Sequence, residues 1–285
     1  MPRLPSTENI EGTPDMTMNT EISPAAASRQ EAPSRVSVRG LRKTYGRGST
    51  AKPVIADLSF EVADGEFLCI VGPSGVGKTT MLKCLSGLIP PSEGEVRIDG
   101  RLIDGPPREM ALVFQDYTRS LMPWLTVERN VMLPLKDSRV PRAERHARVK
   151  RALAEVGLSA AVKKYPWQLS GGMQQRVAIA RALAYQPEVL LMDEPFASLD
   201  AQTRFDLEDL LLALRAELGI TILFVTHDID EAVYLSDRVV VLNGAPCSVA
   251  EIVDVGLGRE RNQITTRGGK QFAELRTHLL TAVRH

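Results

Sequence analysis

Two stretches of the 285-residue chain have the composition of anion-binding sites, and only one of them contains a lysine. The first stretch, "GPSGVGKTT", spans residues 72–80 and follows the apolar run "EFLCIV". Glycines between a buried strand and a helix let successive backbone N–H groups curl around phosphate oxygens. We expect Lys78 to reach the β- and γ-phosphates of a nucleotide and the Thr79 hydroxyl to bind Mg²⁺. Nucleotide contacts are expected along the whole loop, which consists of Gly72, Pro73, Ser74, Gly75, Val76, Gly77, Lys78, Thr79 and Thr80.

The second stretch, "LSGGMQQR", spans residues 169–176 and opens a predicted helix that ends before Pro187. Ser170 is a residue type that caps helix N-termini, and Gly171 and Gly172 leave the first helical N–H groups open to an anion. A capped helix with a flexible entry is the simpler alternative, but it does not explain two poor helix formers in the first turn. Because the chain has one phosphate loop, we expect this second cradle to read a nucleotide that is held elsewhere.

Asp193 and Glu194 follow the apolar run "VLLM", where a buried strand is expected to end. Mg²⁺ keeps most of its waters in protein sites, so one aspartate beside Thr79 is enough to hold it. Glu194 is then placed to position or deprotonate an attacking water. Taken alone, an acidic pair after a strand is more often a helix-start cap, but the phosphate loop earlier in the chain favours the catalytic interpretation.

Three further side chains stand where predicted strands end. His227 follows "TILFVT" and is expected to contact the γ-phosphate and hold the water in line with Glu194, whereas an isolated histidine here would be an ordinary loop residue. Gln115, in "VFQDY", carries an amide that is a candidate ligand for Mg²⁺ or water. Tyr45, in "LRKTYG", offers an aromatic face for stacking on adenine, although a surface aromatic on a strand is nearly as consistent with the local sequence.

Short strands surround the phosphate loop. From Val36 onward, "VSVRGL", "LSFEV" and "EFLCIVG" alternate or run apolar. The pair Asp64 and Gly65 predicts a hairpin turn between the last two strands, and Asp99 and Gly100 close the strand "GEVRIDG". Together these strands predict an antiparallel sheet layer around the phosphate loop.

The second half of the chain has a different pattern. "EVLLMDE" and "TILFVTH" are continuous apolar runs, which are typical of parallel strands covered on both faces. Ligands of open α/β sheets bind at the carboxyl ends of such strands, where both runs become polar. Between them, residues 204–218 have apolar residues at helical spacing and end at Gly219. Residues 117–168 are mainly helical and interrupt this alternation.

Composition excludes several classes of protein. The formal net charge is zero, which argues against nucleic acid as the main partner. No stretch approaches the roughly 18 consecutive apolar residues of a membrane span. The three cysteines, at positions 69, 84 and 247, show no metal-ligand spacing, so we expect a reduced intracellular setting. Residues 1–34 hold five prolines and no aromatic residue, and we predict a disordered tail.

The motifs together resemble those of ABC-transporter ATP-binding subunits. The match follows the chain in order and comprises Tyr45, "GPSGVGKTT", Gln115, "LSGGMQQR", "VLLMDEP", "SLD" at 198–200 and His227. It covers roughly residues 36–245. The resemblance implies an α/β P-loop NTPase fold of ABC-ATPase type, with an antiparallel β layer and a helical insertion subdomain. It implies an ATPase domain at 35–255 with the insertion at about 117–185, followed by a C-terminal helical extension at 256–285.

The resemblance also implies the site and its ligands, ATP and Mg²⁺. Lys78, Glu194 and His227 would be catalytic, and the metal would lie among Thr79, Gln115 and Asp193. The other nucleotide-binding residues would be Tyr45, residues 72–80, and Ser170, Gly171, Gly172, Gln174 and Asp200 from the signature and the "SLD" segment. In this family the signature of one subunit closes over the ATP bound to the other, which accounts for two cradles with one lysine.

Implied partners are a second copy of the chain and transmembrane permease subunits, with an extracytoplasmic solute-binding protein acting indirectly and no nucleic acid. The location would be peripheral, on the cytoplasmic face of the inner membrane. "SLMPWLTVERNV", "YPWQLSGGMQQRVAIARALA", "PFASLDAQTR" and "THDIDEAVYLSDRVVVL" resemble the importers of nitrate, sulfonates and taurine. We therefore expect an ATPase that energises import of a small organic or inorganic anion. The surface around "LMPWLTV" is expected to dock the permease, unless Trp124 is a core residue.

Two other functions compete with import. A cytosolic, non-transport ABC-type ATPase would usually carry a coiled-coil insertion or two cassettes in one chain. A nucleotide kinase would leave "LSGGMQQR" and His227 without roles. The C-terminal segment "FAELRTHLL" predicts an amphipathic helix, which is expected to pack against its own domain rather than to regulate or support a dimer.

Overall fold

The computed structural model describes residues 34–116, 120–136 and 140–284. The predicted tail lies outside the described residues, apart from Ser34, which begins the first strand. Contacts group residues 32–285 into one unit, which contains the predicted ATPase domain and the predicted C-terminal extension. The boundary between those two at residue 255 stays a prediction.

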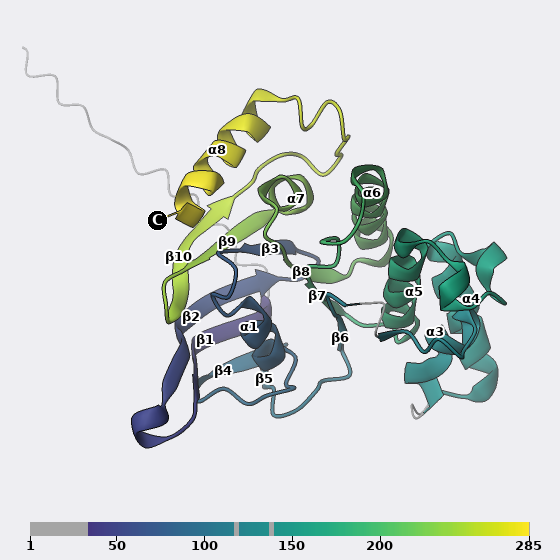
Figure 1. The fold of residues 1–285 in the computed structure, drawn as a ribbon, viewed down its shortest axis with the longest axis horizontal. Helices are drawn as coiled ribbons and strands as arrows, with labels where there is room; N and C mark the ends of the chain where they lie inside the picture. The colour runs from purple at the N-terminus through teal and green to yellow at the C-terminus, as the bar shows by residue number, and fades with distance from the viewer. Residues whose placement is uncertain (1–33, 117–119, 137–139, 285) are drawn as a thin grey trace, which may run out of the picture. The chain divides into compact units, whose positions relative to one another are not determined.

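Within the described ranges, ten strands form one mixed sheet in the order β5-β4-β1-β2-β10-β9-β3-β8-β7-β6 (Figure 1). The antiparallel end consists of β5 (Arg101–Leu102), β4 (Glu93–Ile98), β1 (Ser34–Tyr45) and β2 (Lys52–Ala63). The parallel end consists of β3 (Phe67–Val71), β8 (Thr221–Val225), β7 (Val189–Asp193) and β6 (Met110–Val113). The two ends are joined by β9 (Arg238–Asn243), which runs parallel to β3, and β10 (Cys247–Asp254), which pairs with β9 and β2.

The predicted hairpin at Asp64 and Gly65 is wrong. These residues turn the chain with Gly65 at φ 65°, but β10 and β9 lie between β2 and β3 in the sheet. The reason is burial, because every residue of β3 is buried while β2 alternates between buried and accessible positions. A strand buried on both faces pairs in the parallel part of the sheet. The turn at Asp99 and Gly100 does form a hairpin, between β4 and β5.

Alternate residues of β3 enter two separate hydrophobic clusters, one on each face of the sheet. Phe67, Cys69 and Val71 belong to one cluster, and Leu68 and Ile70 belong to the other. The first cluster includes side chains of the helices α5, α6 and α7, and the second includes those of α1 and the antiparallel strands. The strands β7 and β8 alternate between the same two clusters, with Leu190, Met192, Ile222 and Phe224 in the first and Val189, Leu191, Leu223 and Val225 in the second. The prediction that these two parallel strands are covered on both faces is therefore confirmed.

The helices follow the expected pattern. α1 (Lys78–Leu85) starts directly after the phosphate loop, and α6 (Ala201–Leu218) connects β7 to β8 and ends at Gly219 with φ 65°. α7 (Ile229–Leu235) follows β8. Short 3₁₀ turns lie at η1 (Gly48–Thr50), η2 (Ser159–Ala161) and η3 (Pro166–Gln168).

In its described residues, the predicted insertion includes the helices α3 (Val127–Lys136), α4 (Arg142–Glu155) and α5 (Gly171–Ala184). They pack on one another, and Figure 1 shows them beyond the β6 edge of the sheet. The helical character expected for residues 117–168 is confirmed where the structure describes them.

The C-terminal segment packs on its own domain, as expected. Helix α8 (Lys270–Arg284) buries Phe272 and Leu279 and lies against α7 and β9. Just before it, the Arg267 guanidinium pairs with the buried carboxylate of Glu208 on α6 and stacks over the Tyr234 ring, with 4.9 Å between the guanidinium carbon and the ring centroid. The extension is thus held to α6 and α7.

The three cysteines are free thiols that are buried in this fold. Burial raises the pKa of all three thiols, that of Cys247 to about 11, so they behave as small core side chains. Among the described helices, none combines the length and apolar character that a membrane crossing requires.

Candidate functional site

The phosphate loop joins the buried strand β3 to helix α1, as the sequence predicts. A side chain at Gly72 would place its Cβ 2.6 Å from the carbonyl oxygen of Leu242, and Gly77 adopts φ 119°, so both positions require glycine. Lys78 is buried and folds back over the loop, where its Nζ donates to the carbonyl oxygens of Gly72 at 2.9 Å and Pro73 at 3.2 Å. The ammonium is thus fixed at the mouth of a backbone cradle.

Thr79 and Asp193 meet across the carboxyl end of the parallel strands. The Thr79 hydroxyl donates to Asp193 Oδ2 at 2.9 Å, joining the start of α1 to the end of β7. Burial raises the pKa of the Asp193 carboxyl, and the neighbouring Glu194 adds to this while the Thr79 hydrogen bond opposes it. A hydroxyl and a carboxylate are hard oxygen ligands, so this pair fits Mg²⁺. Within the described ranges there is no group of three or more His, Cys, Asp or Glu side chains that could hold a metal ion.

Glu194 has an unusual backbone that aims its carboxylate into this cluster. It is a non-glycine residue at φ 41°, a conformation with a steric cost that proteins retain mainly at functional sites. Its N–H donates to the Val225 carbonyl on β8 at 2.9 Å, which fixes the turn. Its carboxylate lies 2.8 Å from His227 Nδ1 and 3.5 Å from Lys78 Nζ. The structure therefore brings the three residues predicted to be catalytic together.

Gln115 and Tyr45 differ in their relation to this cluster. Gln115 follows β6 and its amide nitrogen lies 3.4 Å from Glu194 Oε2, so it reaches the edge of the predicted metal site. Tyr45 ends β1 in the antiparallel part of the sheet, half exposed, with Lys43 Nζ 5.3 Å from its ring centroid. It has an accessible aromatic face, and its contact with adenine stays a prediction.

The signature stretch begins α5 as predicted, but its two glycines have different environments. Ser170 caps the helix by accepting the Met173 N–H at 3.3 Å, and Gly171 is exposed. Gly172 is buried, and a Cβ there would lie 2.2 Å from Cγ2 of Thr203 on α6. The second glycine is thus required for packing within the chain, a reason that the sequence did not reveal. Only the first glycine opens to solvent.

The other signature residues are tied to their own surroundings. Gln174 donates from Nε2 to the carbonyl oxygens of Pro166 at 3.1 Å and Leu169 at 3.3 Å. Asp200 caps α6 by accepting the Thr203 N–H at 3.0 Å. Among the described residues, no hydrogen bond or ion pair that the structure shows joins residues 170–172 to residues 72–80.

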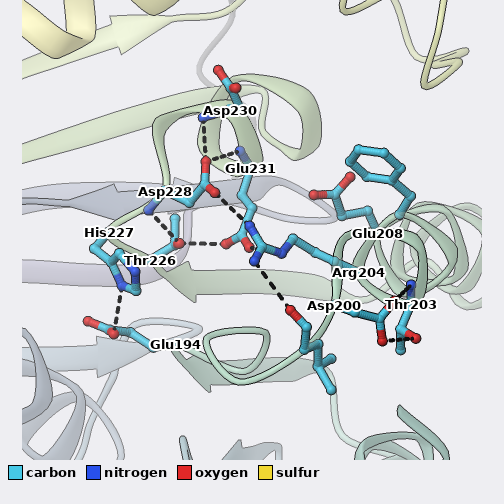
Figure 2. Close-up of polar contacts among 12 residues, drawn as sticks. Glu194, Asp200, Thr203, Arg204, Glu208, Thr226, His227, Asp228, Asp230 and Glu231 are labelled. Carbon is cyan, nitrogen blue, oxygen red and sulfur yellow. Dashed lines mark hydrogen bonds and ion pairs between the residues drawn. The ribbon is translucent and has the colours of Figure 1, made fainter.

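Four residues in the region of His227 were not predicted from the sequence. They are Arg204, Thr226, Asp228 and Glu231 (Figure 2). Asp228 caps α7 by accepting the backbone N–H groups of Asp230 and Glu231, and an aspartate followed three residues later by glutamate is the usual signal for such a cap. The Glu231 side chain does not complete that capping box. It is buried and accepts the Thr226 hydroxyl at 2.5 Å.

The environment of Glu231 moves the titration of its carboxyl toward neutral pH. Burial raises the pKa of its carboxyl to about 7, the nearby carboxylates of Asp228 and Glu208 add to this, and Arg204 and the Thr226 hydroxyl oppose it. A cavity of about 20 Å³ lies between this group and the Glu194–His227 pair. That volume has room for roughly one water molecule.

The chain is similar to ATP-binding proteins of transporters along most of its length. The family described as ABC transporter matches residues 55–197. An uncharacterized ABC transporter ATP-binding protein of Methanocaldococcus jannaschii is 45% identical over 250 residues, which are 88% of this chain and 91% of the relative. The nitrate transport protein NasD of Klebsiella oxytoca is 41% identical over 249 residues, 86% of this chain and 94% of the relative. The aliphatic sulfonates import ATP-binding protein SsuB of Bacillus thuringiensis subsp. konkukian is 40% identical over 252 residues, 88% and 96% of the two chains.

A solved structure shows the same fold. It is a dimeric ATP-binding cassette in a post-hydrolysis state, bound to ADP and Pi. It superposes with a TM-score of 0.68 at 35% sequence identity and covers 78% of this chain and all of that one.

Proposed function

The chain belongs to the ABC transporter ATP-binding proteins, which are ATPases, and from this premise we propose that it hydrolyses ATP to energise import of a small anion through separate membrane subunits. The observation that carries this proposal is the cluster at the carboxyl end of the parallel strands. There Thr79 contacts Asp193, and Glu194 contacts both His227 and Lys78.

The proposed mechanism uses each of these groups at a defined place. Lys78 exchanges its loop carbonyls and the Glu194 carboxylate for the β- and γ-phosphate oxygens of ATP. Thr79, Asp193 and Gln115 would hold Mg²⁺, which would supply positive charge that stabilises those phosphates. Glu194, freed from Lys78, orients the attacking water and accepts its proton.

His227 completes this arrangement. Its Nδ1 contact with Glu194 Oε2 holds the carboxylate in one orientation, and its exposed ring would contact the γ-phosphate.

We propose that the site is completed by a second copy of the chain. The exposed Ser170 and Gly171 at the start of α5 would contact the γ-phosphate of the nucleotide held by Lys78 of the other copy. The exposure of these two residues supports this arrangement, and so does the dimeric cassette that this chain resembles.

A second surface is proposed to dock the permease. Trp124 is 70% exposed, so the alternative that it is a core residue is wrong. The loop that carries it is fixed from inside, because the buried Asn130 side chain accepts the Met122 N–H and donates to the Met122, Leu125 and Thr126 carbonyls. A rigid loop that presents an exposed indole is suited to binding an apolar partner helix. Such docking would place the chain peripherally, on the cytoplasmic face of the inner membrane, with a solute-binding protein acting on the other side.

The names of the relatives support an anion as the solute. Two of them are named for nitrate and for aliphatic sulfonates, which share a negative charge and a small size. The competing function is a cytosolic ATPase that drives no transport, and it leaves the Trp124 surface without a partner.

Reconstitution tests the proposal. The chain, its membrane subunits and the solute-binding protein would be placed in vesicles, and ATP hydrolysis and uptake would be measured with nitrate, an aliphatic sulfonate, taurine and a neutral sugar. We expect one of the charged solutes to stimulate both activities and the sugar to stimulate neither. Stimulation by the sugar alone would contradict the anion assignment, and hydrolysis without any uptake would favour the cytosolic alternative.

A further inference from the structure

Arg204 connects two segments that flank the catalytic cluster. It lies in the first turn of α6, and its Nη1 donates to Asp228 Oδ2 at 2.8 Å (Figure 2). Its Nη2 donates to the carbonyl oxygen of Leu199 at 3.4 Å, and its Nε lies 3.5 Å from Glu231 Oε1. One guanidinium thus joins the segment before α6 to the start of α7.

The α7 end of this connection fixes the backbone on both sides of His227. The Thr226 hydroxyl donates to Glu231 and accepts the Asp228 N–H at 3.0 Å, so the residues before and after His227 belong to one hydrogen-bonded group. Arg204 holds the two carboxylates of that group. Because His227 contacts Glu194 at 2.8 Å, a shift of this group moves the imidazole relative to the catalytic carboxylate.

The α6 end of the connection lies in the "SLD" segment, residues 198–200. Leu199 supplies the carbonyl, and Asp200 caps the helix that carries Arg204. In the proposed two-copy arrangement this segment belongs to the nucleotide-binding surface between the copies. Arg204 therefore bridges the surface that meets the other copy and the histidine that orients the water.

We propose that Arg204 is a positioning residue that couples residues 198–200 to the His227–Glu194 pair during ATP hydrolysis. The inference rests on the proposed function, because it assigns a role only if Glu194 and His227 act in hydrolysis. Arg204 does not touch the nucleotide in this account, and it acts through Asp228 and Glu231.

The competing explanation is that Arg204 only neutralises two carboxylates and stabilises the fold. A lysine keeps the positive charge but loses the planar fork that reaches several acceptors at once. A purely stabilising role therefore predicts a folded Arg204→Lys variant with unchanged turnover. A positioning role predicts lower turnover at unchanged nucleotide affinity, because binding uses Lys78 and the phosphate loop.

The same helix offers a matched control in Arg215, three turns further along. Its guanidinium also binds one aspartate and one backbone carbonyl. Nη1 donates to Asp237 Oδ1 at 3.2 Å, and Nε donates to the Gly65 carbonyl oxygen at 2.8 Å. Its side chain is 14% exposed, compared with 27% for Arg204. Arg215→Lys thus removes a similar fork from α6 at a site without contacts to His227 or to residues 198–200.

The experiment compares full-length wild type, Arg204→Lys, Arg215→Lys and Glu194→Gln by melting temperature, ATP affinity and turnover. We expect Arg204→Lys to lower kcat about tenfold with an ATP Kd within about twofold of wild type, and Arg215→Lys to leave both unchanged. Equal turnover in the two lysine variants, or a matching loss of ATP affinity, would overturn the proposal.

A second variant keeps the test decisive if Arg204→Lys does not fold. Asp228→Asn leaves the α7 cap in place but weakens the link from the other side, and we expect it to lower kcat at unchanged ATP affinity. Where both single variants fold, the double variant should lose no more turnover than the stronger single variant, and additive losses would overturn the coupling.

If wild type hydrolyses no ATP or Glu194→Gln is fully active, the proposed function itself fails. If both of these controls behave as expected and the Arg204 variants are normal, only this inference fails.

Discussion

The phosphate-loop region and the signature region differ in how completely one chain satisfies their polar groups. In the first region Lys78, Thr79, Asp193, Glu194 and His227 all have partners within the cluster or its loop. In the second region, the exposed residues 170 and 171 have their contacts in their own helix turn, and nothing from the phosphate loop bonds to them in the part of the chain that the structure describes. Within one chain, the polar groups of the phosphate-loop region bond to one another, and the signature residues 170 and 171 are exposed to solvent. A site shared between two copies requires one region of each kind.

The two regions also use glycine differently, which sharpens this comparison. Gly72 and Gly77 are needed because backbone or side-chain atoms crowd them or because φ is positive. Gly172 likewise makes room for Thr203, whereas Gly171 is exposed. Of the two signature glycines, Gly171 is therefore the one that is open to an external ligand.

The largest expected effect on ATP turnover comes from a substitution in the phosphate-loop region, at Glu194. Glu194→Gln keeps the size and polarity of the side chain but removes the proton acceptor, so turnover should fall about a hundredfold or more while ATP binding is retained. The variant should accumulate as an ATP-bound dimer, measured by size-exclusion chromatography with and without ATP. Near-normal turnover would show that Glu194 is not the catalytic base. It would also contradict the description of the phosphate-loop region as the catalytic part of the site.

A smaller effect on the ATPase, but a large one on transport, is expected at the docking surface. Trp124→Asp should abolish most solute uptake in the reconstituted complex and leave basal hydrolysis largely intact, because the indole lies outside the nucleotide site. Ile264→Asp is a matched control, since Ile264 is an exposed apolar residue in the C-terminal segment, and it should leave uptake unchanged. Equal loss of uptake in both variants would argue against a specific docking surface at Trp124.

The smallest expected effect concerns pH and the buried Glu231. Its pKa is raised from 4.5 to about 7, so the folded state holds a proton that the unfolded state releases between these values. The contribution of this proton to the free energy of unfolding is complete below about pH 4.5 and is lost as pH rises through 7. Wild type should therefore lose stability relative to Glu231→Gln by about 2 kcal/mol between pH 5 and 8.

Chemical denaturation of both proteins at several pH values measures this difference. A constant gap between wild type and Glu231→Gln across that range would show that Glu231 stays ionised in the fold. Arg204, Asp228 and Glu231 would then form an ion-pair cluster over the whole pH range measured.

Local sequence patterns predicted the strands, the phosphate loop and the cap of α5, because each depends on residues that are close in the chain. The pairing of β2 with β10 instead of β3 was not predictable in this way, since it depends on strands about 190 residues later. Turn chemistry at Asp64 and Gly65 specified a reversal of the chain but not the neighbour of either strand. Burial on both faces of β3 decided the outcome.

The site was predicted in its principal residues but not in its support. Lys78, Asp193, Glu194 and His227 stand in short motifs at the ends of apolar runs, which a sequence shows directly. Arg204 lies in an ordinary amphipathic helix, and its role depends on contacts with residues 24 and 27 positions away. Such contacts arise from the packing of α6 against α7, which no local pattern encodes.

The measurement that tests the central claim most directly uses mixed dimers of two differently tagged chains. Lys78→Ala disables the phosphate-loop part of the site. Gly171→Asp places a negative charge in the signature part, where it would repel the γ-phosphate. With the lesions on opposite chains, a shared site puts both defects in one site and leaves the other intact. With both lesions on the same chain, a shared site makes both sites defective.

We predict that the opposite-chain dimer hydrolyses ATP faster than the same-chain dimer. If coupling between the sites silences both mixtures, ATP-dependent dimerisation replaces turnover as the measurement, and the same ranking is expected. Greater activity or stronger ATP-dependent dimerisation of the same-chain double variant would contradict the account, because each chain would then complete its own site.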